Sequence, residues 1–197
     1  MTAATLSSSS PLPTQKRRQL MPHAVLGTVV FVITELMFFA GLISAHSIVK
    51  LGTVGGWPPD GQPRLPLGET LINTTALLMS GAMLFVAMRV AKKHHARATG
   101  LVTLSIALGA FFILLQGREW LALISEGLTL TSSAHGSFFY LIVGAHALHA
   151  VAGLATLVYL LSQMRKQATT PGTIGAAQIY WYFVVLLWPV LYLKVYL

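Results

Sequence analysis

The chain has 197 residues, of which 55% are hydrophobic and 9% are charged, and its mean hydropathy is +0.71. An average soluble domain is about one-quarter charged, so this composition excludes an ordinary soluble domain and indicates a membrane protein. The formal charge of +8 rests mostly on basic residues between apolar runs, which favours a role in membrane orientation over nucleic-acid binding. Because the chain has no cysteine, disulfides and thiolate metal sites are excluded.

The amino-terminal segment differs in composition from the rest of the chain. Residues 1–23 are rich in Ser, Pro and Thr and include the basic cluster 16–18, which predicts a disordered polar tail. A basic cluster before an apolar run resembles a secretory signal, but the run at 24–49 is too long for one and contains Glu35. Residues 24–197 are therefore predicted to form one transmembrane helix bundle.

Five apolar runs follow one another along the chain. Each is close to the roughly 20 residues that a spanning helix needs, so the fold class is predicted to be all-α, a polytopic membrane bundle of about five transmembrane helices. The third run continues through polar residues 118–120 into 121–124, which predicts a helix that projects beyond the bilayer. The loop at 52–68 contains four prolines and is expected to form a stiff, turn-rich cap. The predicted spans are 24–49, 70–90, 99–117, 136–163 and 174–197.

Basic residues are distributed unevenly between the two sides of this bundle. With the N-terminus inside, the inner segments hold nine Lys and Arg residues and the outer segments hold four. The positive-inside rule then predicts an inner N-terminus and, with five spans, an outer C-terminus. The aromatic residues Trp57, Trp120 and Tyr196 are expected near the outer interface, where amphipathic rings are favoured.

Glu35 is an acid near the middle of the apolar run FVITELMFFAGLISAH. A charge that faces lipid costs several kcal/mol, so Glu35 must face protein or enclosed water. It can tie helices together as a protonated or hydrogen-bonded group, or it can handle protons, and the sequence leaves both interpretations open. Helical spacing predicts that it shares a face with Thr28, Phe31, Phe38, Phe39, Leu42 and His46.

Two histidines lie three residues apart in the fourth run, in the segment GAHALHAVAG. His146 and His149 therefore share one helix face. Such a pair can bind metal or haem, but it can equally make hydrogen bonds across a helix interface, and the structural interpretation is favoured. We predict that one of the two histidines pairs with Glu35. In the third run, Arg118 and Glu119 are expected to form a local ion pair at the interface.

Several separated stretches together resemble subunit III of the haem–copper respiratory oxidases. The likeness runs from about residue 25 to the C-terminus and rests on an acid before a double Phe, a WPP loop, an LxNT entry and an HxxH helix. These features stand in fixed order in the stretches ITELMFFAGLISAH, GWPPDGQPRLPLGETLINTTALLMSG, ALGAFFILLQGREW, GSFFYLIVGAHALHAVAG and YWYFVVLLWPVLYLKVYL.

The resemblance implies a non-catalytic accessory subunit of a terminal oxidase in the bacterial inner membrane. Members of this family carry no redox centre, so no cofactor is expected on this chain, and haem and copper are expected in the partner catalytic subunit. The resemblance also implies packing against subunit I, with subunits II and IV as further candidate partners, bound phospholipid, and support of proton uptake. The electron donor, cytochrome c or quinol, stays open.

The resemblance also assigns expected roles to individual residues. Glu35 matches the acid that the family places before a double Phe, and His146 and His149 match its histidine pair. Glu119 matches the acid of the family's LQ-x-x-E stretch. Arg165 and Lys166 fall where the family has basic character near lipid headgroups.

Two departures from the family keep alternatives open. The last helix usually reads YWHFVD, and here Tyr182 and Val185 replace the histidine and the aspartate. The common form has seven helices, so this chain resembles the five-helix bacterial type. One alternative is the homologous accessory subunit of a nitric oxide reductase, and another is a small membrane haem protein using His46, His146 or His149. A stand-alone proton carrier is disfavoured, because one buried acid makes no relay across a bilayer.

Overall fold

The computed structural model of this protein describes residues 21–54, 56–59, 62, 63, 65 and 67–196. Nearly all of the predicted tail, residues 1–20, lies outside the described residues, and the first helix begins at His23. Within the proline-rich loop, residues 55, 60, 61, 64 and 66 also lie outside the described residues, and the predicted stiffness of the loop remains a prediction.

The described residues form an all-helical structure, as predicted. Its five long helices are each long and apolar enough to cross a membrane. The third helix, at 31 residues, extends well past its apolar run and includes Arg118 and Glu119, and its projection beyond the bilayer remains a prediction. The helices are α1 His23–Gly52, α2 Leu67–Val90, α3 His95–Ser125, α4 Ala134–Arg165 and α5 Pro171–Leu191.

Local sequence explains where the last two helices begin and end. Ser133 caps α4, because its hydroxyl accepts a hydrogen bond from the Gly136 amide at 3.1 Å. Thr170 caps α5 in the same way, and Pro171 occupies the first turn, where a missing N–H costs nothing. Near the other end of α5, Pro189 lacks the N–H that a regular helix needs, and the chain continues as one π-helical turn, η1 Tyr192–Tyr196.

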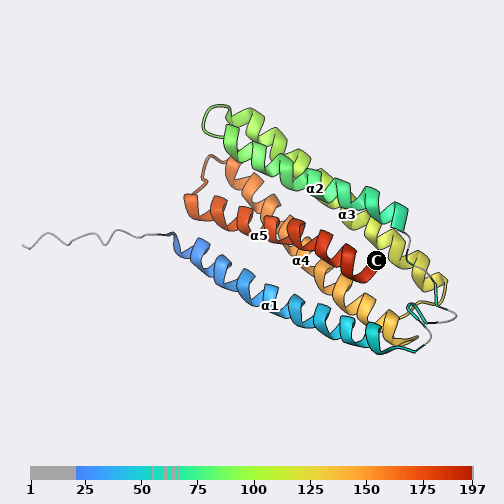
Figure 1. Cartoon of the computed structure of the whole chain (residues 1–197). Helices are drawn as coiled ribbons and strands as arrows, with labels where there is room; N and C mark the ends of the chain where they lie inside the picture. The colour runs from blue at the N-terminus through green and yellow to red at the C-terminus, as the bar shows by residue number, and fades with distance from the viewer. Residues whose placement is uncertain (1–20, 55, 60–61, 64, 66, 197) are drawn as a thin grey trace, which may run out of the picture.

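The helices run antiparallel in an up-and-down bundle (Figure 1). The α2–α3 hairpin forms one side, α4 and α5 lie in the middle, and α1 lies on the far side, where it packs on α5 and α4. We call the end with the start of α1 and the α2–α3 and α4–α5 connections the amino end. The opposite end, with the start of α2 and the C-terminus, is the carboxyl end. On α1 the buried residues are Phe39 and His46, so this helix buries the smallest share of its residues among the five long helices.

Small and hydroxyl-bearing side chains join α2, α3 and α5 in the core. The Ser80 and Ser105 hydroxyls each donate to the other residue's carbonyl oxygen, at 2.7 and 2.8 Å. From α5, the indole N–H of Trp181 donates to Ser80 Oγ at 3.1 Å, and that of Trp188 donates to Thr74 Oγ1 at 2.9 Å. Such contacts matter in lipid, where the hydrophobic effect does not drive helices together.

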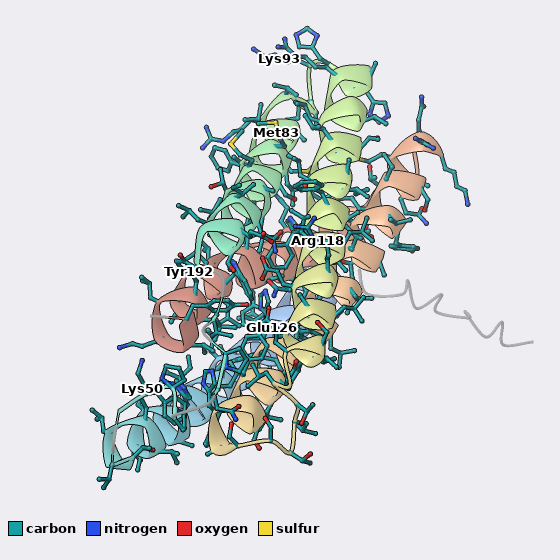
Figure 2. The ribbon with its side chains drawn as sticks, turned by 90° about the vertical axis from the view of Figure 1, so that its right-hand side faces the viewer. Lys50, Met83, Lys93, Arg118, Glu126 and Tyr192 are labelled. Carbon is teal, nitrogen blue, oxygen red and sulfur yellow. The ribbon has the colours of Figure 1, made fainter. Side chains whose placement is uncertain are left out.

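Basic side chains are more numerous at the amino end, where Lys93 lies, than at the carboxyl end, where Lys50 lies (Figure 2). Among the described residues, six Lys and Arg lie at the amino end and three lie toward the carboxyl end. The positive-inside rule predicts orientation from such an excess of Lys and Arg at one end, and the orientation of this chain remains a prediction. The six are Arg89, Lys92, Lys93, Arg97, Arg165 and Lys166.

Candidate functional site

Glu35 on α1 contacts His149 on α4 through a short polar bridge. The carboxyl oxygen Oε2 lies 3.1 Å from Nε2 of the imidazole. The other ring nitrogen, Nδ1, lies 2.7 Å from the carbonyl oxygen of Ala145. Because a carbonyl oxygen can only accept, Nδ1 must carry a hydrogen and donate it. The contact between Glu35 and His149 therefore holds one further proton, on the carboxyl or on the imidazole.

Aromatic rings surround the Glu35–His149 pair. Phe39 and Phe183 present edges to the His149 ring at centroid distances of 5.4 and 6.0 Å, and Phe31 stacks on it at 6.4 Å. The side chains of Glu35 and His149 are 20% and 13% exposed. In such low-dielectric surroundings a carboxyl and an imidazole that satisfy each other are far less costly than either group alone.

His146 has quite different surroundings, although it lies one turn from His149. The ring is 1% exposed, stacks on Trp188 at 5.0 Å, and meets the edge of Phe112 at 6.1 Å. Neither ring nitrogen has a hydrogen-bond partner among the described residues. The predicted pairing of Glu35 with one of two histidines is thus found with His149, while His146 belongs to the aromatic core.

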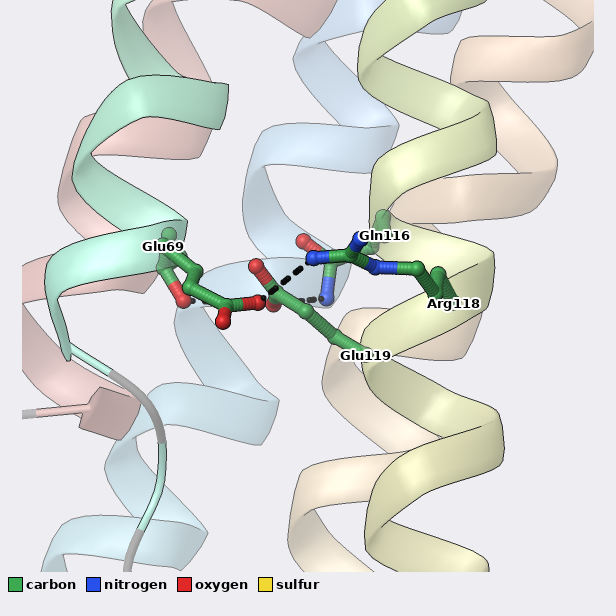
Figure 3. A network of polar contacts seen from close by, with 5 residues as sticks. Glu69, Gln116, Arg118 and Glu119 are labelled. Atoms are coloured by element: carbon green, nitrogen blue, oxygen red, sulfur yellow. Dashed lines mark hydrogen bonds and ion pairs between the residues drawn. The ribbon is translucent and has the colours of Figure 1, made fainter.

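Glu119 lies in a second buried polar cluster, toward the carboxyl end (Figure 3). Its Oε2 accepts hydrogen bonds from Thr70 Oγ1 at 3.2 Å and from Gln116 Nε2 at 3.1 Å. Gln116 Nε2 also donates to the hydroxyl of Tyr196 at 3.0 Å, and its Oε1 accepts from Asn73 at 3.2 Å. The cluster therefore joins α2, α3 and η1.

The predicted local ion pair of Arg118 with Glu119 is wrong. Arg118 Nη2 instead lies 3.0 Å from Oε2 of Glu69 on α2, outside the buried cluster (Figure 3). Residues 118 and 119 are adjacent and point to different faces of α3, so one side chain is exposed and the other buried. Tyr196 is 8% exposed and packs within the bundle, and its position near the outer membrane interface remains a prediction.

Arg165 and Lys166 end α4 at the amino end, and both are exposed. They lie on the same end of the bundle as the basic residues of the α2–α3 connection. Contact with lipid headgroups remains a prediction for them.

The altered residues of the final helix make packing contacts. Val185 is 4% exposed and lies against α2, where a Cβ added at Gly81 would be 3.0 Å from Val185 Cγ1. The hydroxyl of Tyr182 is 3.5 Å from Gln178 Nε2 on the same helix. Val185 therefore contributes a close apolar contact with α2 where the family has an aspartate.

The described residues include no group of three or more His, Asp or Glu side chains placed to hold a metal ion. The expectation that haem and copper belong to a partner subunit remains a prediction.

The sequence did not reveal which residues complete the polar cluster of Glu119. Thr70, Asn73 and Tyr196 come from three separate segments and reach Glu119 and Gln116 only through the packing of the helices. The available signal was weak: each is a polar residue within or beside an apolar run. The partner of Glu35 was easier to predict, because the candidate histidines were few.

Comparison with known proteins agrees with this architecture. The sequence model of the family described as cytochrome c oxidase subunit III matches residues 9–197. A probable cytochrome c oxidase subunit 3 of Nocardia farcinica is 33% identical over 203 residues, which cover 100% of this chain and 98% of the relative. The Mycobacterium leprae relative of the same description is 35% identical over 87% of this chain and 86% of its own length. The cytochrome c oxidase subunit 3 of Sus scrofa is 36% identical over 86% of this chain and 67% of its own length. The chain belongs to the cytochrome c oxidase subunit III family.

Proposed function

We propose that this chain is a non-catalytic accessory subunit of a haem–copper terminal oxidase in a bacterial inner membrane. The observation that carries the proposal is the family match across residues 9–197. The haem and copper that reduce oxygen would then be held by a partner catalytic subunit. The chain would contact that catalytic subunit, stabilise it and support its proton uptake.

The Glu35–His149 pair supports an indirect role in proton uptake. It joins α1 to α4 at a place where α1 buries little of its own surface. Holding α1 in register shapes the outer surface of the bundle, which includes the exposed side chains Phe31, Leu36 and Met37. We propose subunit I as the neighbour of this subunit, with subunits II and IV as further candidates. Glu35 and His149 would be structural groups in this account.

The amino end supports contact with phospholipid. Arg165 and Lys166 would attract anionic headgroups. A basic residue near an anionic membrane surface contributes about 1 kcal/mol of attraction. Two grooves beside α1, of about 640 and 550 Å³, have predominantly apolar linings that suit acyl chains.

The test is purification of the tagged full chain from its own membranes in mild detergent. We expect a haem–copper catalytic subunit to co-purify, and a visible spectrum whose haem signal belongs to that subunit. Recovery with the catalytic subunit of a nitric oxide reductase would overturn the oxidase assignment. A haem signal in the isolated chain would overturn the accessory role.

A pair of histidine variants sharpens this experiment. Replacing both His146 and His149 with Leu should weaken retention of this subunit while the haem spectrum of the complex stays the same. His94→Ala is the matched control, because His94 is exposed on the α2–α3 connection. A haem signal that falls in proportion to the retained double variant would contradict the structural role of the two histidines.

A further inference from the structure

A small pocket lies toward the carboxyl end, where α2 begins. It has a volume of about 300 Å³ and is lined by Glu69, Ile72, Leu115, Arg118 and Glu119. Three of these five residues carry ionisable side chains, in contrast to the predominantly apolar grooves beside α1. One water needs about 10–15 Å³ of such space, so the pocket has room for several.

Glu119 forms the buried wall of this pocket. The residue is 4% exposed, and Oε2 accepts hydrogen bonds from the neutral groups of Thr70 and Gln116. Within the described part of the chain, no Lys, Arg or His forms an ion pair with it. A buried carboxyl without a counter-ion is costly as an anion, and it is stabilised either by a bound proton or by water.

The rim of the pocket is charged and exposed. Glu69 and Arg118 form an ion pair at 3.0 Å, with side chains that are 61% and 68% exposed. Glu69 lies in the first turn of α2. The ionisable groups that face Glu119 are thus Glu69 from α2, Arg118 from its own helix and Tyr196 from η1. Glu69 and Arg118 largely cancel each other, since they are paired.

We propose that this pocket is a water-filled inlet through which Glu119 exchanges a proton with the aqueous phase at the carboxyl end. Glu119 is then a proton-binding carboxyl of this chain, and it differs from Glu35 in access. Glu35 contacts His149 behind aromatic rings, whereas Glu119 meets water through the gap beside the Glu69–Arg118 pair. The proposal concerns the chain itself and does not depend on which complex the chain joins.

Infrared spectroscopy of the full chain in lipid bilayers tests the inlet directly. A protonated carboxyl has a carbonyl stretch that shifts when its proton is replaced by deuterium. We expect Glu119→Gln to remove one such band, and the same band to shift rapidly after transfer of the native chain to D2O. Glu119→Asp keeps a carboxyl and moves the band, which secures the assignment if the Gln variant folds poorly. Glu35→Gln is the control, because it should leave the Glu119 band unchanged.

Filling the pocket provides the decisive comparison. Ile72→Trp places a large ring in the inlet and should slow exchange of the Glu119 band severalfold. Leu71→Trp is the matched control, because Leu71 is exposed on α2 and does not line the pocket. The proposal is overturned if no acid band is lost in the Gln and Asp variants from acid to alkaline pH. It is equally overturned if the Ile72→Trp chain exchanges as fast as the native one.

Discussion

A carboxyl oxygen of Glu35 and a ring nitrogen of His149 lie 3.1 Å apart. The tautomer follows from the other side of the ring, where Nδ1 donates to the carbonyl oxygen of Ala145. The two residues come from helices α1 and α4. A polar contact therefore fixes the relative position of two helices at a place where apolar burial on α1 is sparse.

Removing the carboxyl should loosen α1. Glu35→Ala leaves the imidazole of His149 without its partner, which costs about 1–3 kcal/mol for a buried polar group. We expect a lower midpoint in thermal unfolding of the chain in lipid and easier loss of the subunit from its complex. Thr34→Ala is the matched control, since Thr34 is exposed and its hydroxyl bonds to the backbone of its own helix. Equal unfolding of both variants would contradict the role of the pair.

The two histidines should respond in opposite ways to the same substitution. His146→Leu removes two unpartnered ring nitrogens, which recovers about 1–3 kcal/mol, and loses a stack on Trp188 worth about 0.5–1.5 kcal/mol. The variant should be at least as stable as the native chain. His149→Leu removes the partner of Glu35, and this variant should be clearly less stable than the native chain. Thermal unfolding of the two variants measures the difference, and a large loss from His146→Leu would show that its nitrogens are satisfied.

The sequence predicted the helical elements because each apolar run has the length that a bilayer requires. It also predicted a partner for Glu35, because an acid in lipid needs one and two histidines lay on a single helix face. Phe31 and Phe38, predicted on the same helix face as Glu35, are 43% and 45% exposed. Helical angle alone does not show how far a neighbouring helix reaches around that face.

The polar cluster of Glu119 could not be predicted in the same way. Its members come from α2, α3 and the final turn, and spacing along one helix says nothing about which helices become neighbours. Arg118 was expected to pair with Glu119, yet the packing of α2 on α3 places Oε2 of Glu69 at 3.0 Å from Nη2 of Arg118. The position of Tyr196 depends on η1, which follows a proline near the end of α5.

The indole of Trp181 packs so closely on Gly109 and Gly153 that a side chain at either position would clash with it. A Cβ added at Gly109 would lie 2.8 Å from the ring of Trp181, and one added at Gly153 would lie equally close. Gly109→Ala should therefore destabilise the bundle by about 1–3 kcal/mol, as overpacking does. Gly100→Ala is the control on the same helix, because a Cβ there meets nothing within 4 Å, and it should be neutral or stabilising. Unfolding curves that coincide for the two variants would contradict this packing.

The distribution of basic residues predicts the orientation of the chain in the membrane. The amino end, with six described Lys and Arg residues, should face the cytoplasm, which places the C-terminus outside. Reporter fusions at the α2–α3 connection and at the C-terminus should give opposite sides. If both reporters lie on the same side, the number of spans or the orientation is wrong.

The most direct test of the central claim is the rate of proton uptake as a function of pH in an oxidase complex that carries Glu35→Gln. The glutamine amide can donate to Nε2 of His149 and so keeps the link between α1 and α4, but it cannot ionise. If Glu35 supports proton uptake by holding the subunit in shape, the variant complex takes up protons at nearly the native rate across the pH range. A large loss of uptake in a fully assembled Glu35→Gln complex would show that Glu35 itself carries protons, and would contradict the structural account.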